Sequence, residues 1–198
     1  KKNAAFEFCE AELYLAYKEG KLVGRVAAII NHKANKQWNT KAVRFGWIDF
    51  IDDIEVSRAL LDAVGNYGKA HGMDNIIGPL GFTDMDPEGM LTDGFDQLGT
   101  MATLYNYPYY PRHMQELGGW EKDNDYVEYK LIVPKEMPEK YMKVAQMIEK
   151  RYDLHVRAMT RREIFKDGYG HKVFEVINET FKHLYGYSEL SDRQIDQY

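Results

Sequence analysis

Three carboxylates stand close together at a predicted strand-to-helix turn. The segment from 46 to 72 reads GWIDFIDDIEVSRALLDAVGNYGKAHG, and Asp52, Asp53 and Glu55 fall where an apolar strand gives way to a helical pattern. Such a turn can hold a phosphate, because the first N–H groups of the helix are free and the helix dipole is positive there. Asp52 and Glu55, however, have capping-box spacing, so Asp52 is expected to accept those N–H groups itself. Each close carboxylate would also oppose a bound anion by about 1 kcal/mol. We therefore predict a self-capped helix.

A second acidic segment, FTDMDPEG, follows a predicted buried strand. Asp84, Asp86 and Glu88 alternate along it, and their oxygens could bind a cation or the amine of a substrate. An Asp-Pro turn closed by Gly89 would place the same residues in an ordinary loop. Both interpretations stay open at this point.

Metal sites and disulfides have little support in the composition. The chain has 6 histidines, and none of them lies in an HExxH or similar ligand pattern. Cys9 is the single cysteine, which excludes an internal disulfide and favours a reducing compartment. We therefore assign no metal and expect a cytoplasmic protein.

The charge and hydropathy of the chain exclude two classes of partner. A net charge of -5 gives no electrostatic reason to expect nucleic acid or an anionic membrane surface. The longest apolar run, VAAII, is far shorter than the roughly twenty residues of a membrane span. Partners are therefore expected among small molecules and proteins.

The first two thirds of the chain predict alternating strands and helices. The segment 11–31 predicts a β-hairpin around KEGK, with Gly20 free to adopt a positive φ. A third strand is expected over 41–51, and a helix after it that ends at Gly72. A buried strand over 75–82, a helix from Pro111 and a strand over 125–133 complete the order β-β-β-α-β-α-β.

The pattern changes beyond Pro134. Residues 137–152 predict a helix, DLHVRAM at 153–159 a strand, and the rest further helices. Thr160 with Glu163, and Ser191 with Gln194, have the spacing of helix starts. We accordingly divide the chain into a first domain at 1–134, a connecting helix at 135–152 and a second unit or tail at 153–198.

Three segments of the sequence resemble the GNAT superfamily of acyl-CoA N-acyltransferases. KEGKLVGRVAAI is similar to its second and third strands, SRALLDAVGNYGKAHGMDNIIG to its third helix and next strand, and MQELGGWEKDNDYVEYKL to its closing helix and strand. The resemblance implies an α+β fold with a mixed, mostly antiparallel central sheet flanked by helices. It also places the first strand and helices before residue 1, so we expect a fragment. The tail at 153–198 resembles the opening of a second such module, as in a tandem protein.

The resemblance also implies an activity: transfer of an acyl group from acetyl-CoA or another acyl-CoA to a small-molecule or peptide amine. In that family an acidic residue takes the amine proton through water, and Asp49 occupies a suitable strand position; an ordinary strand-end carboxylate is the alternative. A tyrosine protonates the leaving thiolate. Its family position is Gln115 here, so Tyr110 in YNYPYYPR is the displaced candidate, although tyrosines beside a proline turn more often cover a core edge.

The cofactor position of the family departs from its pattern here. Ile51, Asp53 and Arg58 fall where the family carries a Gln/Arg-x-x-Gly-x-Gly/Ala loop for the pyrophosphate, but IDDIEVSRA contains no glycine. This departure favours an alternative function, a domain that has kept the fold, lost the cofactor and serves as a binding or interaction module. In the first function, the acyltransferase, we expect the acceptor amine to be bound by Asp84, Asp86 and Glu88.

The tail is expected to cover exposed parts of the first unit. A sheet lacking its opening strand would leave an unpaired edge and an uncovered apolar face. Residues 153–198 could cover them within one chain, or across a homodimer by exchange of the tail.

Overall fold

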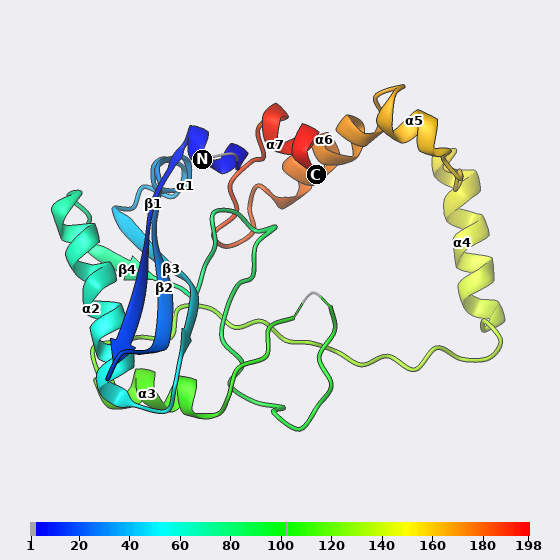
Figure 1. The fold of residues 1–198 in the computed structure, drawn as a ribbon. Helices are drawn as coiled ribbons and strands as arrows, with labels where there is room; N and C mark the ends of the chain where they lie inside the picture. Colours follow the sequence, from blue (N-terminus) through cyan, green and yellow to red (C-terminus); the bar gives the residue numbers. More distant parts are fainter. Residues whose placement is uncertain (1–2, 102) are drawn as a thin grey trace.

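The structure is a computed structural model and describes residues 3–101 and 103–198. It is an α+β fold with one four-stranded mixed sheet flanked by helices (Figure 1). The helical elements are η1 (Ala4–Glu7), α1 (His32–Gln37), α2 (Ile54–Ala70), α3 (Tyr109–Leu117), α4 (Glu139–Tyr152), α5 (Arg161–Phe165), α6 (Tyr169–Phe181) and α7 (Asp192–Gln197). The strands are β1 (Cys9–Lys18), β2 (Lys21–Asn31), β3 (Ala42–Phe50) and β4 (Asn75–Ile77).

The first two strands form the predicted hairpin. Glu19 and Gly20 at its turn have φ angles of 52° and 76°, which is the left-handed conformation that a type I′ turn requires at both central positions. The pairing runs from Lys18 opposite Lys21 to Cys9 opposite Asn31. The hairpin prediction is therefore confirmed. The sequence could predict it because the turn depends on neighbouring residues alone.

The sheet is mostly antiparallel, in the order β1-β2-β3-β4. β1 and β3 each pair antiparallel with β2, whereas β3 and β4 pair parallel. This confirms the expected fold class, and the arrangement is compatible with a GNAT-like fold.

β3 and β4 share only a short stretch of pairing. β4 ends at Ile77, opposite Arg44, while β3 continues to Phe50 in pairing with β2. The β2–β3 register shifts between Arg25 and Ala27, and Trp47 on β3 has a φ of 46°. A non-glycine residue in this conformation marks a β-bulge, which changes the direction of the strand and of the side chains that follow it. The part of β3 that extends beyond β4 leads directly into the acidic turn.

The main core lies between the sheet and α2. Leu60 and Val64 on α2 pack with Phe45 on β3 in one cluster of buried side chains. A smaller cluster on Ala27 and Ile29 of β2 includes Phe82 from the loop after β4. Gly72, with a φ of 75°, follows the last turn of α2 as expected.

Two predicted strands are absent. Residues 125–133 and 153–159 have no regular structure, and every residue from 121 to 160 is exposed. A strand is stable only when its N–H and C=O groups pair with a neighbour, and no described strand lies beside either segment. α4 stands apart from the sheet at the end of the first of these segments (Figure 1). α3 begins at Tyr109, two residues before the predicted Pro111.

The end of the tail packs beside the start of the chain. Tyr187 is fully buried, and its carbonyl accepts a hydrogen bond from Trp38 Nε1 at 2.9 Å. Gln197 of α7 accepts from the backbone N–H of Ala4 at 3.0 Å, so α7 lies beside η1 (Figure 1). Both predicted capping boxes, at Thr160 and Ser191, are present. The division at 134 and 152 stays a prediction.

Candidate functional site

The start of α2 is capped by Asp53, which corrects the prediction that Asp52 is the cap. α2 begins at Ile54, so Asp53 is the residue with extended backbone angles, and its Oδ1 accepts from Glu55 N–H at 3.1 Å. Its other oxygen lies 2.5 Å from Lys18 Nζ on the hairpin. Hydrogen bonds from Lys18 and from the helix N–H groups lower the pKa of Asp53. The helix is self-capped, but one residue later than the sequence spacing indicated.

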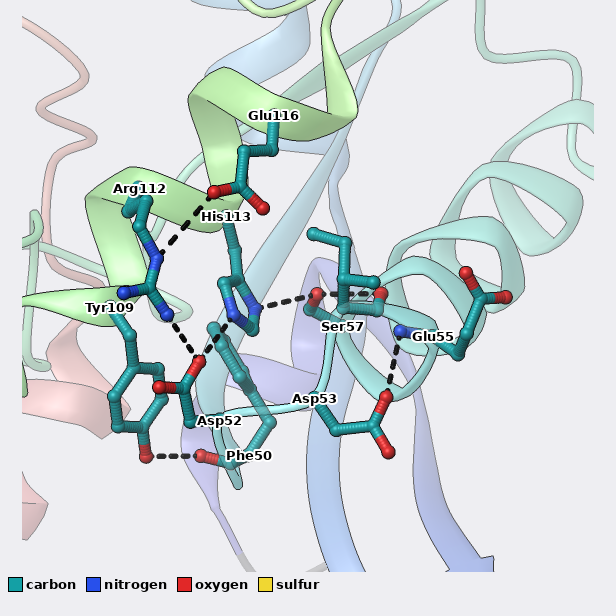
Figure 2. A network of polar contacts seen from close by, with 10 residues as sticks. Phe50, Asp52, Asp53, Glu55, Ser57, Tyr109, Arg112, His113 and Glu116 are labelled. Carbon is teal, nitrogen blue, oxygen red and sulfur yellow. Dashed lines mark hydrogen bonds and ion pairs between the residues drawn. The ribbon is translucent and has the colours of Figure 1, made fainter.

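Asp52 instead binds α3. Its Oδ1 accepts from Arg112 Nη2 at 2.5 Å and from His113 Nε2 at 2.9 Å (Figure 2). The hydrogen bond from Arg112, and then the one from His113, lower the pKa of Asp52. Arg112 also pairs with Glu116 one turn further along α3. The carboxylate therefore joins the end of β3 to α3.

His113 continues this connection into α2. Its side chain is 2% exposed, and its Nδ1 lies 3.0 Å from Ser57 Oγ (Figure 2). The order Ser57–His113–Asp52 is also that of a hydrolase triad. Ser57 is fully buried and donates to the carbonyl of Ile54 at 3.0 Å, so no substrate can contact its hydroxyl. The three residues hold α2, α3 and the end of β3 together.

The two predicted proton-transfer residues are in contact. Tyr110 on α3 donates a short hydrogen bond to Asp49 Oδ1 and accepts one from the N–H of Phe50 at 3.3 Å. Burial, and then the bond to Asp49, raise the pKa of Tyr110, so its hydroxyl keeps its proton. The tyrosine is 5% exposed, whereas the Asp49 side chain is 61% exposed beside Arg25. Their catalytic assignment stays a prediction.

The remaining predicted cofactor residues are exposed around the start of α2. Ile51 is 45% exposed, and Arg58 lies beside Glu55 with 3.7 Å between Nε and Oε1. Asp53 already accepts from the N–H of Glu55 in the first turn of α2, and two further carboxylates flank the turn. These residues do not fit a pyrophosphate at the start of α2.

The acidic loop gathers around Arg44. We define the Arg44 cluster as Arg44 on β3, Asp84 and Glu88 in the loop, and Tyr126. The Arg44 guanidinium is buried and donates to the carbonyls of Gly81, Phe82 and Gly186. Burial is the main cause that raises the pKa of Asp84 to about 6 and that of Glu88 to about 7. Glu88 accepts from Tyr126 at 3.4 Å.

Asp86 has a different position from its two neighbours. Its Oδ2 accepts from the N–H groups of Phe82 and Thr83 at 2.9 and 3.2 Å. These bonds close the turn of the loop itself, as the alternative interpretation of this segment proposed. The structure thus separates Asp86 from the other two predicted substrate-binding carboxylates.

The two groups of candidate residues lie at opposite ends of β3. Arg44 and Asp49 are five residues apart on that strand, which corresponds to a Cα separation on the order of 15 Å. One amine cannot contact both Asp49 and the Arg44 cluster. No group of histidine, cysteine or carboxylate side chains suited to a metal ion occurs in the described residues.

The sequence reasoning missed several residues of both sites. His113, Ser57 and Arg112 come from segments on either side of a long loop, and no spacing relates them. Arg44 did carry a signal, because it interrupts the apolar third strand in KAVRFGWIDFI. A charged residue at an inward position of a strand indicates a buried charge with local partners.

Comparison with known proteins found two curated relatives of low identity. The chain is 27% identical to protein YghO of Escherichia coli strain K12 over 178 residues, which cover 86% of this chain and 46% of that protein. It is 24% identical to a bacterial ceramide synthase of Caulobacter vibrioides over an alignment of 209 residues, which covers 100% of this chain and 50% of that protein.

The chain thus spans about half the length of these two relatives. No family model matches the sequence. No solved structure matches it either. In the described part of the chain, no helix has both the length and the apolar character needed to cross a bilayer.

Proposed function

We propose that this chain is part of an acyltransferase that forms an amide bond on an amine. The observation that carries the proposal is the alignment with the bacterial ceramide synthase, because it extends over the whole chain. A ceramide is by definition an N-acylated long-chain amino alcohol, so its synthesis joins an acyl group to an amine nitrogen. The mixed sheet, compatible with a GNAT-like fold, supports the same reaction class.

The proposed reaction needs two proton transfers. The amine nitrogen attacks the acyl carbonyl carbon, and the bond from that carbon to the leaving group breaks. The nitrogen loses a proton to a base, and the leaving group takes one from an acid. Asp49 as base and Tyr110 as acid are one candidate pair, and the carboxylates of the Arg44 cluster are the other candidate base.

Acyl transfer can be tested with two matched donors. We would supply a long-chain amine with either a fatty acyl-CoA or the same acyl group on N-acetylcysteamine, which lacks the nucleotide and pyrophosphate, and measure the amide by mass spectrometry. Because the start of α2 does not fit a pyrophosphate, we expect the two donors to react at rates within about tenfold, or 1.4 kcal/mol. Absence of amide with every donor and amine would contradict the proposed function.

Three variants test which of the candidate residues transfer the protons. Asp49→Asn and Tyr110→Phe remove the first candidate pair, and Glu88→Gln removes the second candidate base. Loss of a base or acid that transfers a proton should lower the rate by about 10²–10⁴-fold. A variant that retains the wild-type rate excludes its residue from proton transfer.

A second candidate function is an interaction module without catalysis. The capped start of α2 favours it, since Asp53 accepts from an N–H group that a cofactor phosphate would use and the neighbouring Asp52 carboxylate would repel a phosphate. A ligand at one hundred times its dissociation constant adds about 2.7 kcal/mol to stability. The module is favoured if no acyl donor shifts the melting temperature and no amide forms.

A further inference from the structure

Arg44 is a buried cation without a direct anionic partner. Its side chain is 3% exposed, and within the described part of the chain no carboxylate oxygen lies at ion-pair distance from its guanidinium. Its three hydrogen bonds go to backbone carbonyls of Gly81, Phe82 and Gly186. An unpaired buried charge is costly, so its environment must supply negative charge. Asp84 and Glu88 supply it from a longer range and favour the charged guanidinium.

One oxygen of the Asp84 carboxylate also lacks a hydrogen-bond partner in the described part of the chain. This atom, Oδ1, is buried. A buried acceptor without a partner costs about 1–3 kcal/mol, and more when it is charged. Such an atom in a native structure indicates a missing donor.

The charges of the cluster select the type of donor. With Asp84 and Glu88 ionised, two negative charges stand against the one positive charge of Arg44. A phosphate or carboxylate ligand would add to the excess, whereas an ammonium group would neutralise it. Its N–H groups would also supply the donor that Asp84 lacks.

We propose that Asp84 and Glu88, positioned beside the buried Arg44, bind the ammonium group of a primary-amine substrate, and that Glu88 takes one proton from this group before the nitrogen attacks the acyl donor. This inference rests on the proposed function. It identifies the Arg44 end of β3 as the place where the amine substrate binds. Asp86 takes no part, because its carboxylate is committed to the turn. A Glu88 oxygen first takes one proton from the ammonium, which frees the lone pair of the nitrogen. The nitrogen then bonds to the acyl carbon, the bond from that carbon to the leaving group breaks, and the second proton lost by the nitrogen goes to the leaving group.

The ionisation of Glu88 suits this role. Burial, and then the charge of Asp84, raise its pKa to about 7, so near neutral pH it is partly ionised and able to accept a proton. The other charged and titratable groups that act on the cluster come from β1, the loop and the tail. They are Cys9, Asp86, Tyr185 and Tyr187.

Ligand binding provides a test that does not require catalysis. We would titrate the full chain with octylamine and with octanol, which has the same tail but no charge, and follow amide chemical shifts by NMR. At pH 8 we expect octylamine to bind at least tenfold more tightly than octanol. At pH 5.5, where Glu88 is largely protonated, octylamine should bind at least tenfold more weakly than at pH 8.

Three variants complete the test. Asp84→Asn and Glu88→Gln should each weaken octylamine binding about tenfold or more and leave octanol binding unchanged. Asp93→Asn, an exposed carboxylate further along the same segment, is the matched control and should stay within about twofold of wild type. Thermal unfolding of each variant establishes that it is folded.

The outcomes separate this inference from the proposed function. Equal binding of octanol and octylamine, or octylamine binding by Glu88→Gln equal to wild type, would overturn the ammonium site. Amide formation lost in Asp49→Asn but retained in Glu88→Gln would overturn the proton-acceptor role while leaving acyl transfer in place. Selective octylamine binding without any amide formation would support the site and refute only the proposed enzyme.

Discussion

The hydrogen bond between Tyr110 and Asp49 can be tested by Tyr110→Phe. The substitution keeps the ring, whose centroid lies 4.1 Å from that of Phe50 in a stacked arrangement. It removes the hydroxyl that accepts from the Phe50 N–H and donates to Asp49. Only the polar contacts are therefore lost.

The expected cost follows from the burial of the two partners. Phe50 is 4% exposed, so its N–H loses an acceptor that water cannot easily replace, at about 1–3 kcal/mol. Asp49 is exposed, so water can hydrate its carboxylate and adds little to the cost. We expect a loss of about 1.5 kcal/mol in the free energy of unfolding.

Urea unfolding measures this loss. With a slope of about 2 kcal/mol per molar urea, the midpoint should fall by about 0.7 M. Tyr107→Phe, which changes an exposed tyrosine two residues from the start of α3, should leave the midpoint unchanged and serves as the control. Asp49→Asn should also keep the midpoint, because an amide oxygen still accepts from Tyr110.

The result that would refute the reasoning is an unchanged midpoint in Tyr110→Phe. It would mean that the hydroxyl stabilises neither Phe50 nor the contact between α3 and β3. If the midpoint falls as expected while the rate of amide formation stays at the wild-type value, Tyr110 is a structural residue and not the acid.

Three further predictions concern the same sites. His113→Ala should lower the free energy of unfolding by about 2–4 kcal/mol in a urea titration, because it removes a buried ring and its bonds to Ser57 and Asp52; a change below about 0.5 kcal/mol would argue against the connection between α2 and α3. Glu88 has a pKa raised in the folded state from 4.5 to about 7, so the folded chain binds this proton more tightly and stability should fall as pH rises through about 4.5 to 7; Glu88→Gln should flatten that part of a stability–pH curve, and a slope equal to wild type would show that the residue titrates normally. Acetyl-CoA should bind no more tightly than about 10 μM by calorimetry, about -7 kcal/mol, because carboxylates surround the start of α2; a lower dissociation constant would show that a phosphate is accepted there.

Local structure could be predicted from the sequence. The KEGK turn, the end of α2 at Gly72 and the capping boxes at Thr160 and Ser191 depend on residues within a few positions of one another. The fold class followed from the order of these segments and from their resemblance to the GNAT superfamily. Spacing also located the acidic turn, although it assigned the cap to the wrong one of two adjacent aspartates.

The partners of polar side chains were decided by the tertiary structure. Asp52 binds Arg112 and His113, which lie 60 and 61 positions away, and only the packing of α3 against α2 brings them together. The same holds for Arg44, whose carbonyl acceptors come from the loop after β4 and from the tail. Many arrangements of distant segments satisfy the same local pattern, so no spacing could have selected these pairs.

The absent strands also depend on contacts between distant segments. Residues 125–133 have the alternating apolar pattern of a strand, yet they are exposed and form no strand because no described strand pairs with them. Strand propensity favours a conformation, but the hydrogen bonds that stabilise it belong to a neighbour elsewhere in the chain. The sequence therefore determined the hairpin turn, the glycine after α2 and the two capping boxes, and it located the starts of α2 and α3 to within two residues. Only the tertiary structure decided which side chains meet and which strands find a partner, because both depend on contacts between segments far apart in the chain.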